Sequence, residues 1–142
     1  MSFDLALINN DLVLQVNGDV RTVTDTPKLR QDILKIILTP LGSIKSHMWY
    51  GCSIGEDVIG LGTSDLMYIS RIQISISKGL DRLKALQQSQ SVNQNVSLAE
   101  LIDIVAAVDV QRDVSDPRQI NVVVTVLSKR LTKIEEIFTI MS

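Results

Sequence analysis

The fold is decided by residues 120–126, Ile-Asn-Val-Val-Val-Thr-Val, in which Ile120, Val122, Val124 and Val126 take every second position. A period of two, filled mainly by β-branched side chains, predicts a strand with one buried face. Asp116-Pro117 interrupts the chain just before this strand. A second apolar run, residues 102–110, is therefore expected to pair with it as an antiparallel hairpin.

Residues 131–140 allow two interpretations. The apolar positions Leu131, Ile134, Phe138 and Met141 would suit one face of a helix. The segment also suits a third strand, which is the interpretation adopted here. Residues 99–140 are then an antiparallel sheet.

Residues 64–86 are predicted to form a long helix, capped by Thr63 or Ser64. Its main apolar stripe recurs every three or four residues: Leu66, Ile69, Ile72, Ile76, Leu80 and Leu83. A weaker second stripe contains Met67, Ile74 and Ala85. Because a short chain cannot easily cover two faces of one helix, the second stripe favours a partner. Gly79 either weakens this helix or permits a close backbone contact.

The remaining segments complete an α+β chain of one expected domain, residues 1–142. Residues 1–24 are predicted to be a β-meander with a hairpin turn at Asn17-Gly18. Residues 26–39 are predicted to be a helix, with Thr26 as its cap and Pro27 at its first position. Residues 40–63 are expected to be an ordered loop, pinned to the core by Trp49-Tyr50. Residues 87–97 are predicted to be a polar linker.

Composition excludes several classes of protein. The chain has 142 residues, 45% of them apolar and 21% charged, which is not the composition of a disordered chain. The net charge is −2 and 4% of residues are aromatic, which disfavours nucleic-acid binding. The chain lacks an apolar run long enough to span a bilayer, and its start has no export signal, so folding in the cytoplasm is expected without a membrane partner. With one cysteine and one histidine, neither a metal nor a cofactor is expected.

Catalytic motifs are scarce. His47 and Cys52 are interpreted as structural, because a nucleophile needs a neighbouring base. Glu56-Asp57 is the best-placed acid pair for glycoside hydrolysis, although adjacent loop acids usually form a solvated turn or a helix cap. Gly60-Leu61-Gly62 lacks the lysine of a phosphate-binding loop. The long helix also has a basic side, interpreted as solvated rather than polyanion-binding: Arg71, Lys78, Arg82 and Lys84.

The order of several motifs resembles the baseplate wedge and sheath-initiator family of contractile phage tails. These proteins are also called gene-25-like or lysozyme-like baseplate proteins and have relatives in type VI secretion. The resemblance rests on Leu29-Arg30-Gln31-Asp32-Ile33, Ile36-Ile37-Leu38-Thr39-Pro40-Leu41-Gly42-Ser43 and Trp49-Tyr50-Gly51. The family's Glu-Pro-Arg motif is replaced by Ala99-Glu100-Leu101, and Asp116-Pro117-Arg118 lies later.

The resemblance implies a non-enzymatic assembly protein of the virion, located in the tail baseplate and assembled in the host cytoplasm. The expected partners are other wedge subunits, the tail sheath protein and the central hub or tube-spike proteins, with six copies per particle. The long helix would join a wedge bundle, and the C-terminal strands would template the first sheath ring by β-augmentation. The partner-binding residues are predicted to be Met67, Arg71, Ile74, Lys78, Arg118, Asn121, Val123, Val124 and Thr125. The alternatives are a peptidoglycan-cleaving lysozyme-like enzyme, using Glu56 or Glu100, and a small adaptor or chaperone.

Overall fold

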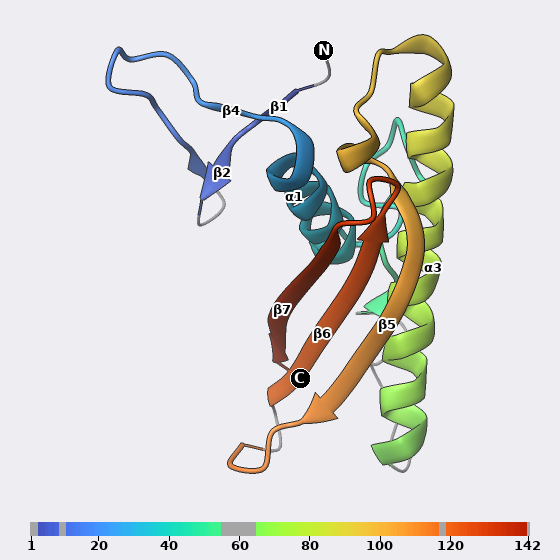
Figure 1. The fold of residues 1–142 in the computed structure, drawn as a ribbon. Helices are drawn as coiled ribbons and strands as arrows, with labels where there is room; N and C mark the ends of the chain where they lie inside the picture. The colour runs from blue at the N-terminus through green and yellow to red at the C-terminus, as the bar shows by residue number, and fades with distance from the viewer. Residues whose placement is uncertain (1–2, 9–10, 55–64, 117–118, 142) are drawn as a thin grey trace.

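The computed structural model describes residues 3–8, 11–54, 65–116 and 119–141 and confirms the α+β class (Figure 1). A projecting N-terminal arm leads into helix α1 (Asp25–Leu38). The long helix α3 (Asp65–Asn93) and a short 3-10 turn, η1 (Leu98–Glu100), follow. The described chain ends in the strands β5 (Ile102–Arg112), β6 (Gln119–Ser128) and β7 (Lys133–Met141).

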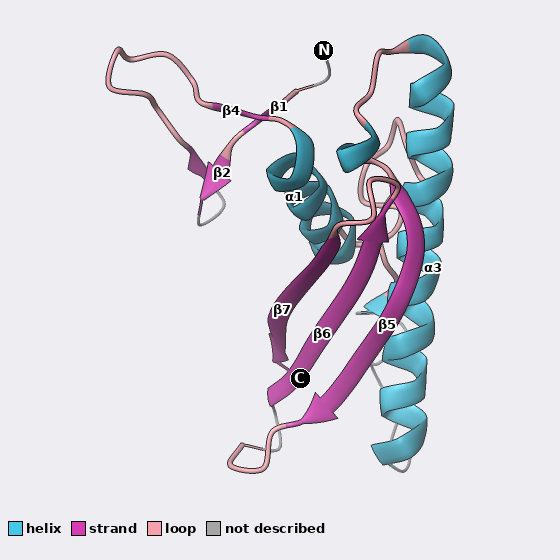
Figure 2. Cartoon of the chain, viewed as in Figure 1, coloured by secondary structure: helices cyan, strands magenta, loops and turns pink. Residues whose placement is uncertain are grey.

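The C-terminal strands form an antiparallel sheet in the order β5-β6-β7 (Figure 2). Residues 133–141 are thus strand rather than helix, as interpreted from the sequence. The order also corrects one prediction, because Val124 does not lie on a docking edge. β6 is the central strand, and Val124 pairs with Val108 on one side and with Glu136 on the other.

The core lies between one face of this sheet and the two helices. α3 packs along β5, and α1 contacts β7. The inner face of β6 supplies Ile120, Val122, Val124 and Val126, all at most 1% exposed. The helices supply Leu29, Ile33, Ile36, Ile72, Ile76 and Leu80. Ile72, Ile76 and Leu80 belong to the main apolar stripe predicted for the long helix. The side chain of Leu66, from the same stripe, lies outside the described residues.

α1 begins at Asp25, and its cap differs from the prediction. Thr24 holds the N-cap position, but its side chain makes no capping hydrogen bond. Instead the Glu100 carboxylate accepts the Asp25 backbone N–H at 3.1 Å. Glu100 is 2% exposed, so a residue distant in sequence satisfies the start of this helix from within the core.

α3 continues to Asn93, so the polar linker predicted over residues 87–97 is wrong for most of its length. Gln87 explains the extension. Its side chain is 4% exposed, donates to the Glu100 carbonyl at 2.9 Å and accepts the Ile102 N–H at 2.9 Å. A glutamine that looks solvated in the sequence thereby fastens the end of α3 to the start of β5.

The described part of the loop after α1 is ordered, as predicted. The Cys52 N–H donates to the Thr39 carbonyl at 2.9 Å, and the Leu41 N–H donates to the Cys52 carbonyl at 3.0 Å. Tyr50 packs against the core, but Trp49 is 45% exposed, so the tryptophan does not pin the loop as predicted. The predicted acid pair Glu56-Asp57 and the glycines at 60 and 62 lie outside the described residues.

The N-terminal arm projects away from the helices and the sheet (Figure 1). It contains β1 (Asp4–Leu5), β2 (Leu7–Ile8), β3 (Asp11–Leu12) and β4 (Thr22–Val23). β1 pairs with β4, β2 pairs with β3, and Leu14 bridges to Val20. The ladders meet at Ala6, whose N–H donates to Arg21 and whose carbonyl accepts from Val13. The predicted meander is therefore present in short, interlocking pieces.

Candidate partner-binding surfaces

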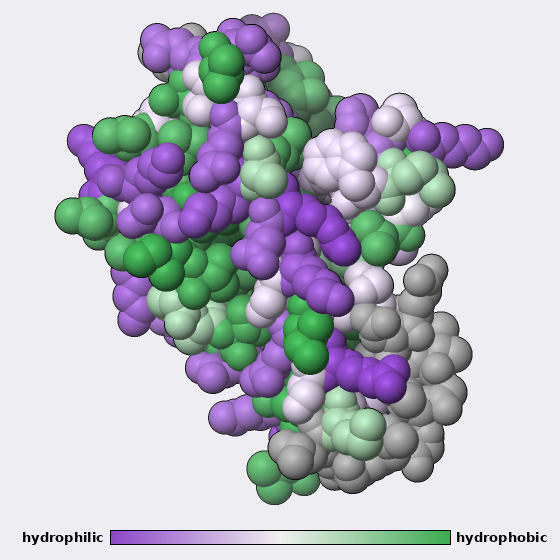
Figure 3. All heavy atoms as spheres, turned by 90° about the vertical axis from the view of Figure 1, so that its right-hand side faces the viewer, coloured by the Kyte–Doolittle hydropathy of each residue, from purple (hydrophilic) through white to green (hydrophobic). Residues whose placement is uncertain are grey.

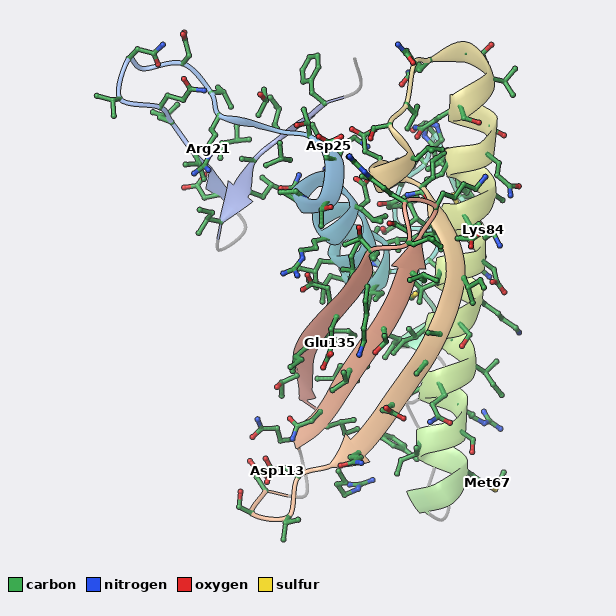
Figure 4. The ribbon with its side chains drawn as sticks, in the orientation of Figure 1. Arg21, Asp25, Met67, Lys84, Asp113 and Glu135 are labelled. Carbon is green, nitrogen blue, oxygen red and sulfur yellow. The ribbon has the colours of Figure 1, made fainter. Side chains whose placement is uncertain are left out.

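The outward face of α3 presents a continuous exposed stripe, which we call the α3 seam. Successive positions are four and three residues apart, and every side chain is exposed: Met67, Arg71, Ile74, Lys78, Asp81, Ala85, Gln88 and Val92. Met67 is 49%, Ile74 53% and Val92 83% exposed. Figure 3 faces this side of the molecule, where apolar and hydrophilic side chains are intermingled, and Figure 4 shows Met67 pointing away from the sheet. The structure thus places four predicted partner-binding residues on one open face.

The predicted basic side of α3 divides in two. Lys84 donates to the Asp103 carbonyl at 2.7 Å, and Arg82 donates to the Gly51 carbonyl at 3.0 Å. Both are therefore used within the chain, tying α3 to β5 and to the loop. Arg71 and Lys78 remain exposed on the α3 seam.

The predicted residues of β6 separate between the two faces of the sheet. Asn121, Val123 and Thr125 are half-buried on the outer face, and Val124 is in the core. Arg118 lies outside the described residues. The outer face also carries Ile104 and Ile137, which are 55% and 68% exposed. The register places Ile104 beside Leu127 and Ile137 beside Val123, so the two exposed isoleucines lie on different edge strands of this face.

The sheet has two edges of different character. β5 has register shifts at two places, and these irregularities hinder the addition of another strand. A helix contacts each edge strand, α3 along β5 and α1 at β7. β7 pairs with β6 in continuous register from Lys133 to Met141. β7 is consequently the edge with the more regular backbone.

The register shows which backbone groups of β7 are free. The Ser128 N–H donates to the Thr132 carbonyl at 3.0 Å, which makes this a hydrogen-bonded pair of the antiparallel ladder. Because such pairs alternate, residues 134, 136, 138 and 140 direct their backbone groups toward β6. Glu135, Ile137 and Thr139 then direct theirs outward, toward a potential added strand.

The arm carries an apolar face that sequence reasoning did not single out. Strand pairing places the following exposed side chains on a common side: Leu5, Leu7, Leu12, Leu14, Val16 and Val20. The alternation of Leu12, Leu14 and Val16 was a visible signal. What the sequence did not show is that the neighbouring strands add their leucines to the same side and that all of these side chains stay at least 37% exposed.

A polar clamp fastens the arm to α1. The Gln31 side chain accepts the Leu7 N–H at 2.9 Å and donates to the Leu5 carbonyl at 2.7 Å and to Asp4 at 3.1 Å. Lys35 makes an ion pair with Asp4. Burial alone would raise the pKa of the Asp4 carboxyl, but the Lys35 hydrogen bond and charge outweigh it and hold that pKa below its usual value. The Asp4–Lys35 contribution should therefore be present above the ordinary pKa of 3.8 and be lost as the pH falls through the lower folded value.

Replacing Gln31 by Ala should loosen the arm without unfolding the chain. The Leu7 amide is expected to exchange with deuterium about fivefold faster, since one hydrogen bond contributes roughly 1 kcal/mol and opening here is local. Hydrogen-exchange mass spectrometry of the arm measures this rate. Gln15→Ala, at an exposed arm position, is the matched control and should leave the rate unchanged. Equal exchange in wild type and Gln31→Ala would show that the clamp does not hold the arm.

A polar cleft of about 290 Å³ lies beside this clamp and brings together Asp4, Lys28, Asp32 and Tyr50. Burial raises the pKa of Asp32, although Lys28 at 2.9 Å opposes the shift. Burial and the charges of Asp32 and Asp4 raise the pKa of Tyr50 to about 12. Each carboxylate has a lysine partner: Asp32 pairs with Lys28 within α1, and Asp4 pairs with Lys35, so the second ion pair is the one that joins α1 to the arm.

The described residues that were considered for catalysis, namely Glu100, Cys52 and His47, are placed unfavourably for it. Glu100 is inside the core, where it caps α1 and is closed to a glycan. Cys52 is 3% exposed, and burial raises its pKa to about 11, which disfavours the reactive thiolate. His47 is exposed. Its ring forms a hydrogen bond with the Ser46 hydroxyl and an edge-to-face contact with Trp49. Among the described residues, none group as three or more potential metal ligands.

None of the described helices combines the length and the apolar character that a membrane span requires.

Comparisons with known proteins bear on the fold. No protein-family model matches the sequence, and no curated protein matches it. A crystal structure described as a tail lysozyme from Geobacter sulfurreducens has a similar fold, with a TM-score of 0.59 over 80% of this chain and 86% of that one. The two sequences are 11% identical. The likeness therefore shows the fold alone, an α+β arrangement common to the two chains.

Proposed function

We propose that this chain is a non-enzymatic structural subunit of a contractile tail baseplate. The fold shared with a protein described as a tail lysozyme supports a place in the virion tail. Assembly in the host cytoplasm is part of the same proposal. The observation that carries the proposal is the pair of open surfaces on opposite sides of the molecule, the α3 seam and the β7 edge (Figure 1).

Each surface suits a different partner. The α3 seam has the spacing that helices use to pack against one another, so it would contact helices of other wedge subunits. The β7 edge offers outward backbone groups to a strand of the sheath protein, which would add itself to the sheet. Six copies in a ring would act together through effective concentration and fix the register of the first sheath ring. Tube-spike or hub proteins are further expected neighbours.

A proline at position 137 tests the β7 edge. Because the Ile137 N–H points away from β6, Ile137→Pro should remove an outward donor and leave the internal ladder intact. We expect purified tails that contain the variant subunit in normal amount but carry sheath at least tenfold less often, counted by electron microscopy.

The matched control is Ile137→Ala, which removes the same side chain and keeps the N–H. It should assemble sheath almost normally. Circular dichroism of the purified Ile137→Pro chain should show that the fold persists. Normal sheath attachment in Ile137→Pro tails would reject β7 as the docking strand.

A further inference from the structure

The α3 seam is chemically self-complementary when it is read in opposite directions. The seam positions are symmetric about its centre, so Met67 matches Val92, Ile74 matches Ala85 and Lys78 matches Asp81. The fourth match is Arg71 with Gln88. A seam spaced by four and three always has this geometric symmetry, but the agreement in chemistry is a property of this sequence. Apolar residues match apolar ones, and the central cation matches the central anion.

Antiparallel pairing of two copies would bring these matches into contact. When two helices pack antiparallel through seams of this spacing, the first seam position of one helix faces the last seam position of the other, the second faces the second-last, and so on. The two-fold axis that relates the two copies would produce every match twice. Two Lys78–Asp81 contacts would lie at the centre, with an Ile74–Ala85 contact on either side. A parallel pair in register would instead oppose Lys78 to Lys78 and Asp81 to Asp81, which like-charge repulsion disfavours.

The surface is long and open enough for such a contact. At 1.5 Å per residue the seam extends about 38 Å from Met67 to Val92. All its positions are exposed, and the sheet and α1 lie on the other side of α3 (Figure 1). Ala85 opposite Ile74 is a small residue facing a large one, which lets the backbones approach at that layer.

We propose that the free subunit forms an antiparallel homodimer through the α3 seam. This inference rests on the proposed function in one respect. In the proposed baseplate, the same seam contacts helices of other wedge subunits. Self-pairing would then cover an exposed apolar stripe before assembly and would have to be displaced during incorporation. Exposed ion pairs are individually weak, so the dimer is expected to be reversible, as displacement requires.

The first experiment measures the mass of the purified full chain by sedimentation velocity as its concentration increases. Wild type should shift from monomer to dimer. Lys78→Glu alone and Asp81→Lys alone should each weaken dimerisation at least tenfold, because each opposes like charges at the centre. Both side chains are exposed, so thermal unfolding should be unchanged in each variant when it is compared with wild type at a concentration where all chains are monomeric.

An equimolar mixture of the two variants is the most discriminating experiment. Lys78→Glu has two acids at the centre and Asp81→Lys has two bases, so an equimolar mixture should restore the dimer as a heterodimer. A monomeric mixture, or wild type that stays monomeric up to millimolar concentration, would overturn the proposal.

Cysteine pairing determines the register. The native Cys52 is buried and should not interfere. Ile74→Cys combined with Ala85→Cys in one chain should give a covalent dimer under mild oxidation, whereas each single variant should not. In the antiparallel register, the two copies of residue 74 are about 16 Å apart along the axis, and so are the two copies of residue 85. This distance is too long for a disulfide. Cross-linking by the single variants would contradict the antiparallel arrangement.

Failure of this inference and failure of the proposed function give different results. A monomeric chain that still enters tails normally removes the dimer and leaves the baseplate role. A dimeric chain that is absent from finished tails supports the dimer and removes the baseplate role.

Discussion

Val124→Pro is expected to abolish the cooperative fold of the chain. Val124 is 1% exposed in the middle of β6 and is paired on both sides, with Val108 and with Glu136. By the alternation of the ladder its N–H points to β7, so proline removes an internal hydrogen bond, and its ring cannot adopt the extended geometry freely. The loss of a core side chain adds to this cost. We expect at least about 4 kcal/mol of destabilisation, measured by thermal and urea unfolding followed by circular dichroism.

Ile137→Pro is the matched control for this result. Both substitutions place proline in the same sheet, on neighbouring strands. Only Val124→Pro interrupts a strand that is paired on both sides, so a large difference in unfolding temperature is expected between them. If Val124→Pro unfolded at the wild-type temperature, the assignment of β6 as the central strand would be wrong. Loss of sheath attachment in Val124→Pro tails would not test docking, because the variant chain is expected to be unfolded.

Gly79→Ala is expected to destabilise the chain although alanine favours helices. A Cβ at position 79 would meet Cys52 Sγ well inside van der Waals contact, and Cys52 is held by the backbone bonds of Thr39 and Leu41. Helix propensity alone would favour alanine by about 1 kcal/mol. Overpacking in a close-packed core costs about 1–3 kcal/mol and should outweigh that gain. Urea unfolding should show a net loss of stability.

Cys52→Ala identifies the cause. In the wild-type background this substitution removes a buried sulfur and should reduce stability. In the Gly79→Ala background it removes the clashing atom, so it should restore stability. The double-mutant cycle should give a coupling of about 2 kcal/mol. Additive effects of the two substitutions would show that α3 does not approach the loop as closely as described.

The sequence predicted the elements well where a period was long and uniform. The alternation of residues 120–126 gave β6 and its buried face, and the three-four spacing from Ile69 to Leu83 gave the core face of α3. Met67, Arg71, Ile74 and Lys78 were predicted to contact a partner, and the structure places them together on an open face. The contact itself stays a prediction. In these cases the residues that define the feature are near neighbours in the chain, so a repeating pattern encodes it.

Tertiary structure decided what depends on residues far apart. The sequence could not show that β6 is central, because strand order depends on how the chain returns after residue 128. The predicted end of α3 was wrong, because the hydrogen-bond partners of the Gln87 side chain, the Glu100 carbonyl and the Ile102 N–H, lie beyond a turn. Likewise, the apolar side of the arm becomes a surface only when three short ladders align their leucines. Local periodicity fixes which side chains share a face, whereas hydrogen bonding between distant segments decides which edges and faces are left open to another molecule.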